Sequence, residues 1–233
     1  MLTDSSEAPD FRGVIALDGP SGTGKSTVAR LLAQRLRAQY LDTGAMYRAA
    51  TVAVLQAGID PEDPIAVAAR VAMCRIEVGT DPRHRSTRLN GQDIEREIRS
   101  AATTAAVSAV SAVQAVRAQL VAQQRSLISQ GPTVAEGRDI GSVVWPDAEL
   151  KVYLTAREEV RARRRAGELG EPDLGRIARA LRKRDAFDSS RAASPLRRPD
   201  GSTEVDTSEL TIDEVVELLA GLALRAVSAV DRA

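Results

Sequence analysis

The residues of this chain best suited to chemistry lie between Gly19 and Ser26, where the sequence reads GPSGTGKS. The run has the spacing G-x-x-x-x-G-K-S, follows the apolar residues 14–17 and precedes a helical pattern that starts near Val28. Glycines let the backbone turn its N–H groups toward a phosphate, and a following helix N-terminus adds partial positive charge. The pattern predicts an ATP site made of Gly19, Pro20, Ser21, Gly22, Thr23, Gly24, Lys25, Ser26 and Thr27.

Side chains in and beside this loop could manage the charge of a bound nucleotide. Lys25 can reach the β- and γ-phosphates, and the Ser26 hydroxyl can bind Mg²⁺. Asp18 and Glu136 each end an apolar run that is expected to be a buried strand. Either carboxylate could hold a water bound to Mg²⁺ or accept hydrogen bonds at its strand end, and the sequence leaves both roles open. The expected cofactor is Mg²⁺ together with ATP.

Arginine is concentrated in one stretch of a chain that is neutral as a whole. The 233 residues contain 32 Lys and Arg and 32 Asp and Glu, yet residues 157–198 contain 13 basic residues against seven acidic ones. A planar guanidinium binds two phosphate oxygens at once, so such a cluster suits phosphoryl transfer. The alternative is a basic helix face that contacts only solvent.

Strands and helices alternate along the chain. Short apolar segments are expected to be strands, and the amphipathic or alanine-rich segments between them are expected to be helices. This alternation predicts an α/β fold with a parallel sheet covered by helices on both faces. Strands are predicted at 13–17, 39–42, 132–135, 150–154 and 203–206, and helices at 24–38, 43–55, 60–73, 101–129 with a break near Val113, and from Thr211 onward.

Local signals mark the ends of some elements. Thr43 is predicted to cap the helix that follows it, and Thr211 with Glu214 forms a capping-box pattern. Residues 74–99 alternate in polarity around a turn and predict a β-hairpin with a basic tip at 81–86. His84, the only histidine, lies at that tip and is expected to have a surface role.

Composition narrows the class of protein. Cys74 is the only cysteine, which excludes an intramolecular disulfide and a cysteine metal cluster. No run approaches 18 apolar residues, so we expect no membrane span. Residues 1–11 are expected to be a flexible tail, since MLTDSSEAPD lacks the basic start and apolar stretch of a signal peptide. A cytoplasmic location is therefore expected.

Seven stretches identify the type of phosphate-binding protein. In order they are IALDGPSGTGKST (15–27), LDTGAMYRA (41–49), EIRS (97–100), VSAVSAVQAVRAQL (107–120), VAEGRDIGSVVWPDAELKVYLTA (134–156), RDAFDSSRAASPL (184–196) and EVDTSELTIDEVV (204–216). With these stretches the chain resembles the bacterial cytidylate kinases, a family of nucleoside monophosphate kinases. It lacks the N-K-x-D run expected of a guanine-specific switch and the L-S-G-G-Q run expected of a transport ATPase.

The resemblance implies a molecule of three parts. A P-loop NTPase-type core would comprise residues 12–42, 101–156 and 173–233. An insertion at 43–100 would bind the nucleoside monophosphate, and a short lid at 157–172 would close over the phosphates.

The resemblance also implies roles for individual residues. Tyr47, Arg48, Arg138 and Arg191 would hold the acceptor phosphate. Ser108, Arg117 and Asp139 would read the cytosine edge, with Thr43 lining the same pocket. Arg184 and Asp188 would hold the ribose hydroxyls. Lys25, Arg138 and the lid residues Arg161, Arg164 and Arg165 would be catalytic.

The implied activity is transfer of the γ-phosphate of ATP to CMP or dCMP, giving CDP or dCDP in pyrimidine nucleotide metabolism. A P-loop kinase for another small acceptor, such as dephospho-coenzyme A, is the alternative enzyme. A regulator that binds RNA through residues 157–198 is the non-enzymatic alternative, but an aromatic content of 3% offers few bases a stacking platform. We expect a monomer with small-molecule partners only, and no nucleic acid or membrane.

Overall fold

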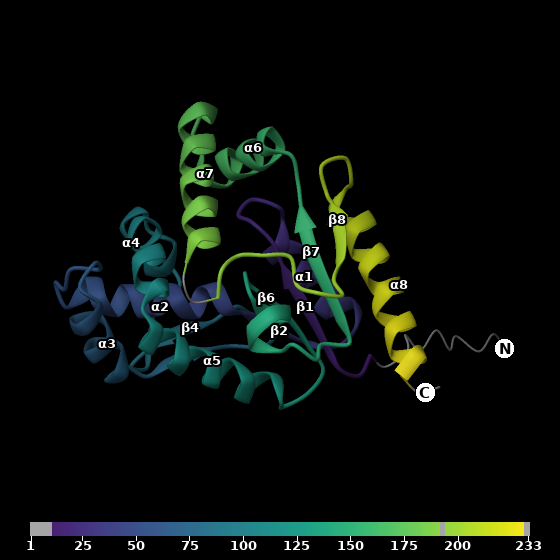
Figure 1. Cartoon of the computed structure of the whole chain (residues 1–233), viewed down its shortest axis with the longest axis horizontal. Helices are drawn as coiled ribbons and strands as arrows, with labels where there is room; N and C mark the ends of the chain where they lie inside the picture. The colour runs from purple at the N-terminus through teal and green to yellow at the C-terminus, as the bar shows by residue number, and fades with distance from the viewer. Residues whose placement is uncertain (1–10, 192–193, 231–233) are drawn as a thin grey trace.

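The computed structural model describes residues 11–191 and 194–230. Its centre is a five-stranded parallel sheet with the strand order β2-β6-β1-β7-β8 (Figure 1). All five predicted strands are confirmed, each to within one residue at either end. They are β1 (Val14–Asp18), β2 (Gln39–Asp42), β6 (Thr133–Glu136), β7 (Leu150–Thr155) and β8 (Thr203–Asp206).

Both faces of this sheet are buried, as a parallel sheet requires. In β1, Val14 and Ala16 belong to one apolar cluster, while Ile15 and Leu17 belong to the other. The cluster around Ile15 and Leu17 is covered by α1 (Lys25–Arg35) and α8 (Ile212–Val230). Helices from the middle of the chain cover the opposite cluster. The predicted α/β architecture with helices on both faces is thus confirmed.

On the second face, α2 (Thr43–Gln56) and α5 (Gln114–Ile128) contact the sheet, while α3 (Pro64–Ala72) and α4 (Ala101–Ala112) pack on those two helices. The predicted break at Val113 is confirmed, because its extended backbone (φ −68°, ψ 116°) separates α4 from α5. Among the described residues, no single helix is long and apolar enough to cross a membrane. α4 and α5 meet these two criteria only when they are taken together, and the angle between them is 94°.

Residues 74–99 form more than the predicted hairpin. Three short antiparallel strands lie side by side: β3 (Ile76–Val78), β4 (Thr87–Leu89) and β5 (Gln92–Asp93). Asn90 and Gly91 both have positive φ, 52° and 84°, which suits the tight turn between β4 and β5. A 3₁₀ turn, η1 (Glu97–Arg99), then leads into α4.

The basic tip of this small sheet lies against the core. The side-chain amide of Gln34 in α1 donates to the carbonyl of Pro82 at 2.8 Å. The backbone N–H of Tyr40 in β2 donates to the carbonyl of Thr80 at 2.9 Å. Two hydrogen bonds therefore connect the 80–82 segment to α1, which directly follows the glycine loop, and to β2.

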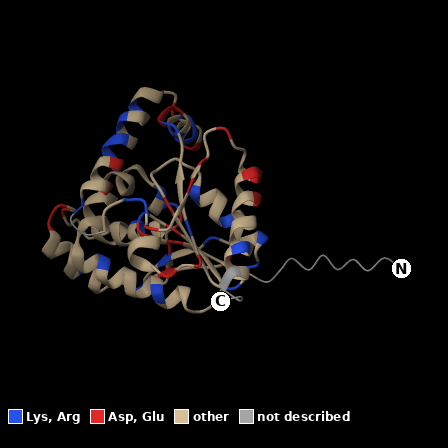
Figure 2. Cartoon of the chain, turned by 45° about the vertical axis from the view of Figure 1, so that its right-hand side comes forward, with Lys and Arg blue, Asp and Glu red and all other residues tan. Residues whose placement is uncertain are grey.

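Two helices stand beyond the carboxyl end of β7, at the top of Figure 1. They are α6 (Glu158–Leu169) and α7 (Leu174–Ser190). They pack on each other through a small apolar cluster of their own, made of Ala162, Ala166, Ile177 and Leu181. Most of the basic stretch predicted from the sequence falls on this helix pair (Figure 2).

The structure corrects the predicted starts of two helices and confirms one predicted capping box. Asp42 rather than Thr43 caps α2, since its carboxylate accepts from the Ala45 N–H at 2.9 Å; the prediction for Thr43 was wrong. The helix expected from residue 60 begins at Pro64, because Asp63 is its cap. The Thr211–Glu214 capping box is confirmed: the Glu214 N–H donates to the Thr211 hydroxyl at 3.3 Å, and the Thr211 N–H donates to the Glu214 carboxylate at 2.8 Å.

The predicted tail at 1–11 lies almost wholly outside the described residues. Its last residue, Phe11, is only 2% exposed and belongs to the cluster beneath α1 and α8. The packed core therefore includes residue 11.

The packing of α8 yields a stability prediction. Leu219 is fully buried against the sheet, whereas its neighbour Leu218 is 42% exposed. Leu219→Ala should lower the free energy of unfolding by about 2–5 kcal/mol, because it leaves a cavity. Leu218→Ala should change it by no more than about 0.5 kcal/mol. Urea unfolding of both variants measures the difference, and equal losses would contradict this packing of α8.

Candidate active site

The glycine loop joins β1 to α1 at the carboxyl edge of the sheet. Gly19 has φ 143°, and a Cβ there would lie 2.2 Å from the carbonyl oxygen of Leu154 in β7. Gly22 has φ 80°, and its Cβ would lie 3.0 Å from the carbonyl oxygen of Arg161. Backbone conformation and close approach both favour glycine at these two positions. The loop thus lies directly against β7 and α6.

Lys25 is buried at the start of α1, with 6% of its surface exposed. Its ammonium donates to the carbonyl of Pro20 at 2.6 Å and to the hydroxyl of Thr23 at 3.4 Å. Burial, together with the nearby guanidinium of Arg138, holds the pKa of Lys25 well below its usual range. A cation held in this way gains from an arriving phosphate.

Ser26 and Glu136 form the oxygen-rich end of the site. The Ser26 hydroxyl donates to one carboxylate oxygen of Glu136 at 2.9 Å, and the Tyr40 hydroxyl donates to the other at 2.5 Å. Burial, with the charge of Asp42, raises the pKa of Glu136 to about 7. The donor set fits Mg²⁺, a hard cation that prefers oxygen.

No group of three or more His, Cys, Asp and Glu side chains that could hold a metal occurs in the described part of the chain.

Asp18 has a different partner set. Its two carboxylate oxygens accept from the backbone N–H groups of Ile140 and Gly141, each at 2.8 Å. Both residues belong to η2 (Ile140–Val144), a π-helical turn that follows β6. Burial raises the pKa of Asp18 to about 6, against the lowering effect of the two backbone donors. In this structure Asp18 therefore has the strand-end role that the sequence left open.

Arg138 spans the glycine loop and α7. Its guanidinium donates to the carbonyl of Gly19 at 3.0 Å, to the Ser21 hydroxyl at 2.6 Å and to the Asp188 carboxylate at 3.0 Å. The loop therefore has a predicted catalytic arginine directly against its first turn.

The three predicted lid arginines differ in their contacts. Arg161 pairs with Asp185 of α7 and donates to the carbonyl of Ser21 at 3.1 Å. Arg164 donates to the carbonyl of Thr23 at 3.3 Å and to the Thr207 hydroxyl at 2.9 Å. Arg165 instead pairs with Glu168 within α6 at 2.8 Å. Two of the three thus contact the glycine loop directly.

A group of arginines gathers on the side where the acceptor phosphate is expected. Arg48 of α2 donates to the Ile98 carbonyl at 2.8 Å and to the Thr104 hydroxyl at 3.0 Å. Burial and the charge of Arg165 lower the pKa of Arg48 to about 10. Burial and the charges of Arg138 and Arg48 lower the pKa of Arg184 to about 9.

Arginine stays protonated in proteins, so these shifts mark positive charge that is not fully compensated. Within residues 11–191 and 194–230, the buried Nε of Arg184 has no hydrogen-bond partner.

Two of the three residues predicted to read the base, Arg117 and Asp139, meet as a buried ion pair. Arg117 of α5 forms an ion pair with Asp139, and its guanidinium carbon lies 5.4 Å from the centre of the Tyr47 ring. Burial raises the pKa of Asp139, although Arg117 and Arg191 act in the opposite direction. Ser108 lies half-buried on α4, one turn before Ser111.

The structure brings almost all predicted site residues to one region. Thr43 donates its hydroxyl to the Glu136 carbonyl at 2.6 Å, which places it at the junction of the loop and the acceptor side. Asp188 pairs with Arg138 and lies 3.9 Å from Arg191. The Tyr47 ring lies against Arg117 of the Arg117–Asp139 pair, so its predicted contact with the acceptor phosphate stays a prediction.

Sequence reasoning missed four residues of this region. Tyr40 contacts Glu136, Asp185 contacts Ser21, Thr207 contacts the loop, and Ser111 contacts Arg117 and Arg191. Asp185 and Ser111 lie inside the matched stretches, so their neighbours in sequence were the available signal. Thr207 also lies inside a matched stretch, whereas Tyr40 follows only from the sheet register, which places strand ends side by side.

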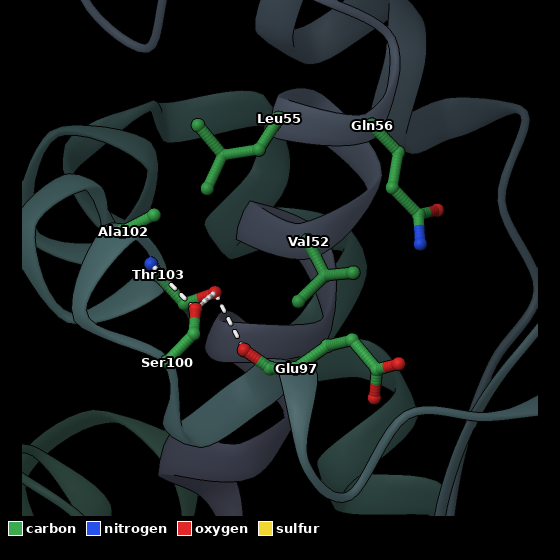
Figure 3. A pocket seen from close by; sticks show the side chains of 7 residues that line it. All are labelled: Val52, Leu55, Gln56, Glu97, Ser100, Ala102 and Thr103. Atoms are coloured by element: carbon green, nitrogen blue, oxygen red, sulfur yellow. Dashed lines mark hydrogen bonds between the residues drawn. The ribbon is translucent and has the colours of Figure 1, made fainter.

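An open pocket of about 290 Å³ lies elsewhere, between α2, η1 and α4 (Figure 3). Its lining residues include none of the predicted site residues. The Ser100 hydroxyl accepts from the Thr103 N–H at 3.1 Å, and the Thr103 hydroxyl donates to the Glu97 carbonyl at 2.7 Å. These polar groups of its wall already have partners, so we do not assign the chemistry to this pocket.

Comparisons with known proteins agree with the site. A sequence model of the family described as cytidylate kinase matches residues 15–224. A cytidylate kinase of Rhodococcus jostii strain RHA1 is 55% identical over 208 residues, covering 87% of this chain and 91% of that protein. A cytidylate kinase of Nocardia farcinica is 50% identical over 220 residues, covering 92% and 95%.

The crystal structure of a gluconokinase from Sinorhizobium meliloti 1021 has a TM-score of 0.53 at 17% identity, covering 96% of this chain and 98% of that one. That likeness shows a shared fold alone. Family membership rests on the sequence matches, which extend over the glycine loop, the base-reading cluster and the arginines of α7. The chain belongs to the cytidylate kinase family.

Proposed function

We propose that this chain transfers the γ-phosphate of ATP to CMP or dCMP, giving CDP or dCDP. The observation that carries the proposal is the group formed by Arg48, Arg138 and Arg184, whose charges are close enough to act on one another. Arg138 also contacts the glycine loop and directly precedes Asp139 of the buried Arg117–Asp139 pair. Such a group would supply positive charge where two phosphates would meet. Family membership supports this acceptor over dephospho-coenzyme A.

The acceptor is itself a phosphate, and this simplifies the chemistry. Its second pKa is about 6, so at neutral pH the attacking oxygen is already mostly ionised. A general base is therefore unnecessary, and the exposed surface position of His84 is no obstacle. The remaining difficulty is repulsion between two polyanions that must align. The chain's part is to position them and to neutralise the charge that spreads over the moving group.

The residues divide this work between them. Backbone N–H groups of the loop and Lys25 would hold the ATP phosphates, while Arg48, Arg138 and Arg191 would hold the acceptor phosphate. Ser26 and Glu136 would hold Mg²⁺, which when bound neutralises phosphate charge. Arg184 and Asp188 would hold the ribose, and either sugar would be accepted.

The base would be selected by how well its hydrogen-bonding edge matches the buried polar groups of the site. Cytosine offers an amine donor together with N3 and O2 acceptors, so Asp139 can accept while Arg117 and Ser108 donate. A base with the wrong edge would leave buried groups without partners, which disfavours its binding.

Two further segments of the chain have proposed roles. We assign monophosphate binding to residues 43–100 and lid closure to 157–172. The shared apolar cluster of α6 and α7 supports a lid that moves together with the first turns of α7. A cytoplasmic monomer that uses small molecules only stays a prediction from the sequence.

The first test is acceptor choice. With Mg²⁺ and ATP, the protein should phosphorylate CMP and dCMP much faster than AMP or GMP, with UMP a weaker substrate, because only cytosine satisfies the Arg117–Asp139 pair. A coupled assay of ADP release with each monophosphate and with dephospho-coenzyme A gives the ranking. Equal turnover of AMP and CMP would refute the assignment.

The second test concerns Lys25. Lys25→Ala should lower kcat by at least about 100-fold, the range for loss of one preorganised charge contact. Its thermal unfolding should change little, because the loop is built from backbone. Lys151→Ala, a half-buried lysine on β7 outside the proposed site, is the control and should keep normal turnover. Normal turnover in Lys25→Ala would show that this loop does not hold the reacting phosphates.

The third test separates transition-state contacts from substrate binding. Replacing Arg161, Arg164 and Arg165 with alanine should reduce kcat for CMP by about 100-fold, with KM within a few-fold, because contacts made only at the transition state act on kcat. Arg48→Ala or Arg191→Ala should mainly raise KM for CMP.

Arg163→Ala, on the exposed side of α6, is the matched control for loss of a lid charge. A triple variant with unchanged kcat and a raised KM would mean that these arginines only steer substrates.

A further inference from the structure

Asp185, on α7, reaches the glycine loop from outside the set of residues assigned above. One carboxylate oxygen accepts from the backbone N–H of Ser21 at 3.3 Å, and the other pairs with Arg161. The same Arg161 nitrogen donates to the Ser21 carbonyl at 3.1 Å. The two charged side chains are largely buried, 11% exposed for Arg161 and 17% for Asp185.

The Ser21 N–H belongs to the loop whose backbone donors suit phosphate oxygens. An acid accepting from that N–H places negative charge where a nucleotide phosphate would bring its own. The Asp185 charge is also close enough to act on Lys25. Without nucleotide, this carboxylate partly offsets the positive charge of Lys25 and Arg161.

We propose that Asp185 is a positioning residue that competes with nucleotide phosphate for the glycine loop and so sets nucleotide affinity. An arriving phosphate would take the Ser21 N–H and displace the carboxylate, which then keeps Arg161 close to the loop. Like charges disfavour the simultaneous presence of both anions, so the carboxylate weakens binding of ATP and ADP. The inference rests on the proposed function only in assuming that the loop binds phosphate.

A purely structural role of Asp185 would give a different result. If Asp185 only braces α6 on α7, its removal would loosen Arg161 and leave nucleotide affinity unchanged or weaker. The chain contains a matched control for that role. Glu158 of α6 pairs with Arg182 of α7, so it also joins the two helices through an ion pair, but among the described residues it makes no hydrogen bond or ion pair with the loop.

The experiment compares full-length Asp185→Asn and Glu158→Gln with the unaltered protein, each losing one negative charge. Isothermal titration calorimetry with Mg²⁺ and ADP, without CMP, measures nucleotide affinity, and inorganic pyrophosphate serves as a second probe that lacks a base. Asp185→Asn should bind both about tenfold more tightly at low salt. The gain should shrink as salt is raised, because screening weakens charge repulsion. Glu158→Gln should bind like the unaltered protein.

Asp185→Ala tests the same charge if the Asn variant does not fold. Unchanged or weaker affinity in the folded variant overturns the inference, and so does an equal gain in Glu158→Gln, which would reflect net charge alone. Failure of the proposed function is seen separately, as absent CMP phosphorylation by the unaltered protein, and leaves this affinity comparison intact.

Discussion

Arg48, Arg138 and Arg184 are held closer together than their charges favour, and burial adds to the cost. Such a group is stable only if the surrounding fold fixes it, because mutual repulsion would otherwise separate the side chains. Arg48 comes from α2, Arg138 follows β6, and Arg184 comes from α7. Elements from three parts of the chain therefore hold a concentration of positive charge that suits a bound polyanion.

The site arginines differ in whether a carboxylate side chain is paired with them. Asp188 pairs with Arg138, Asp139 with Arg117 and Asp185 with Arg161, so several site arginines already have one fixed partner. A fixed partner holds the guanidinium plane in place and leaves other N–H groups for substrate. Arg48 and Arg184 show no carboxylate partner within ion-pair distance in the described part of the chain, and burial and neighbouring arginines lower their pKa values to about 10 and about 9.

The sequence predicted local features well because they depend on neighbours along the chain. The five strands, the break at Val113 and the Thr211–Glu214 capping box follow from composition and spacing within a few residues. The cap of α2 was misassigned because Asp42 and Thr43 both suit that position; Thr43 is engaged by Glu136, 93 residues away.

Contacts between distant residues could not be predicted in the same way. The pairing of Asp185 with Ser21 joins residues 164 positions apart. The docking of the 80–82 segment onto α1 and β2 depends on how the small sheet folds back, which no local pattern encodes.

Asp18 explains how the donor and acceptor sides keep a fixed separation. It is the last residue of β1, immediately before the glycine loop, and its carboxylate holds Ile140 and Gly141 directly after the base-reading Asp139. Parallel pairing of β1 with β6 aligns Leu17 with Glu136, so both segments leave the sheet at the same edge. One buried carboxylate thus joins the start of the glycine loop to the turn that follows Asp139, the residue predicted to read the base. Phosphoryl transfer depends on alignment more than on proton chemistry, so a buried contact that fixes these two segments relative to each other serves the proposed reaction directly.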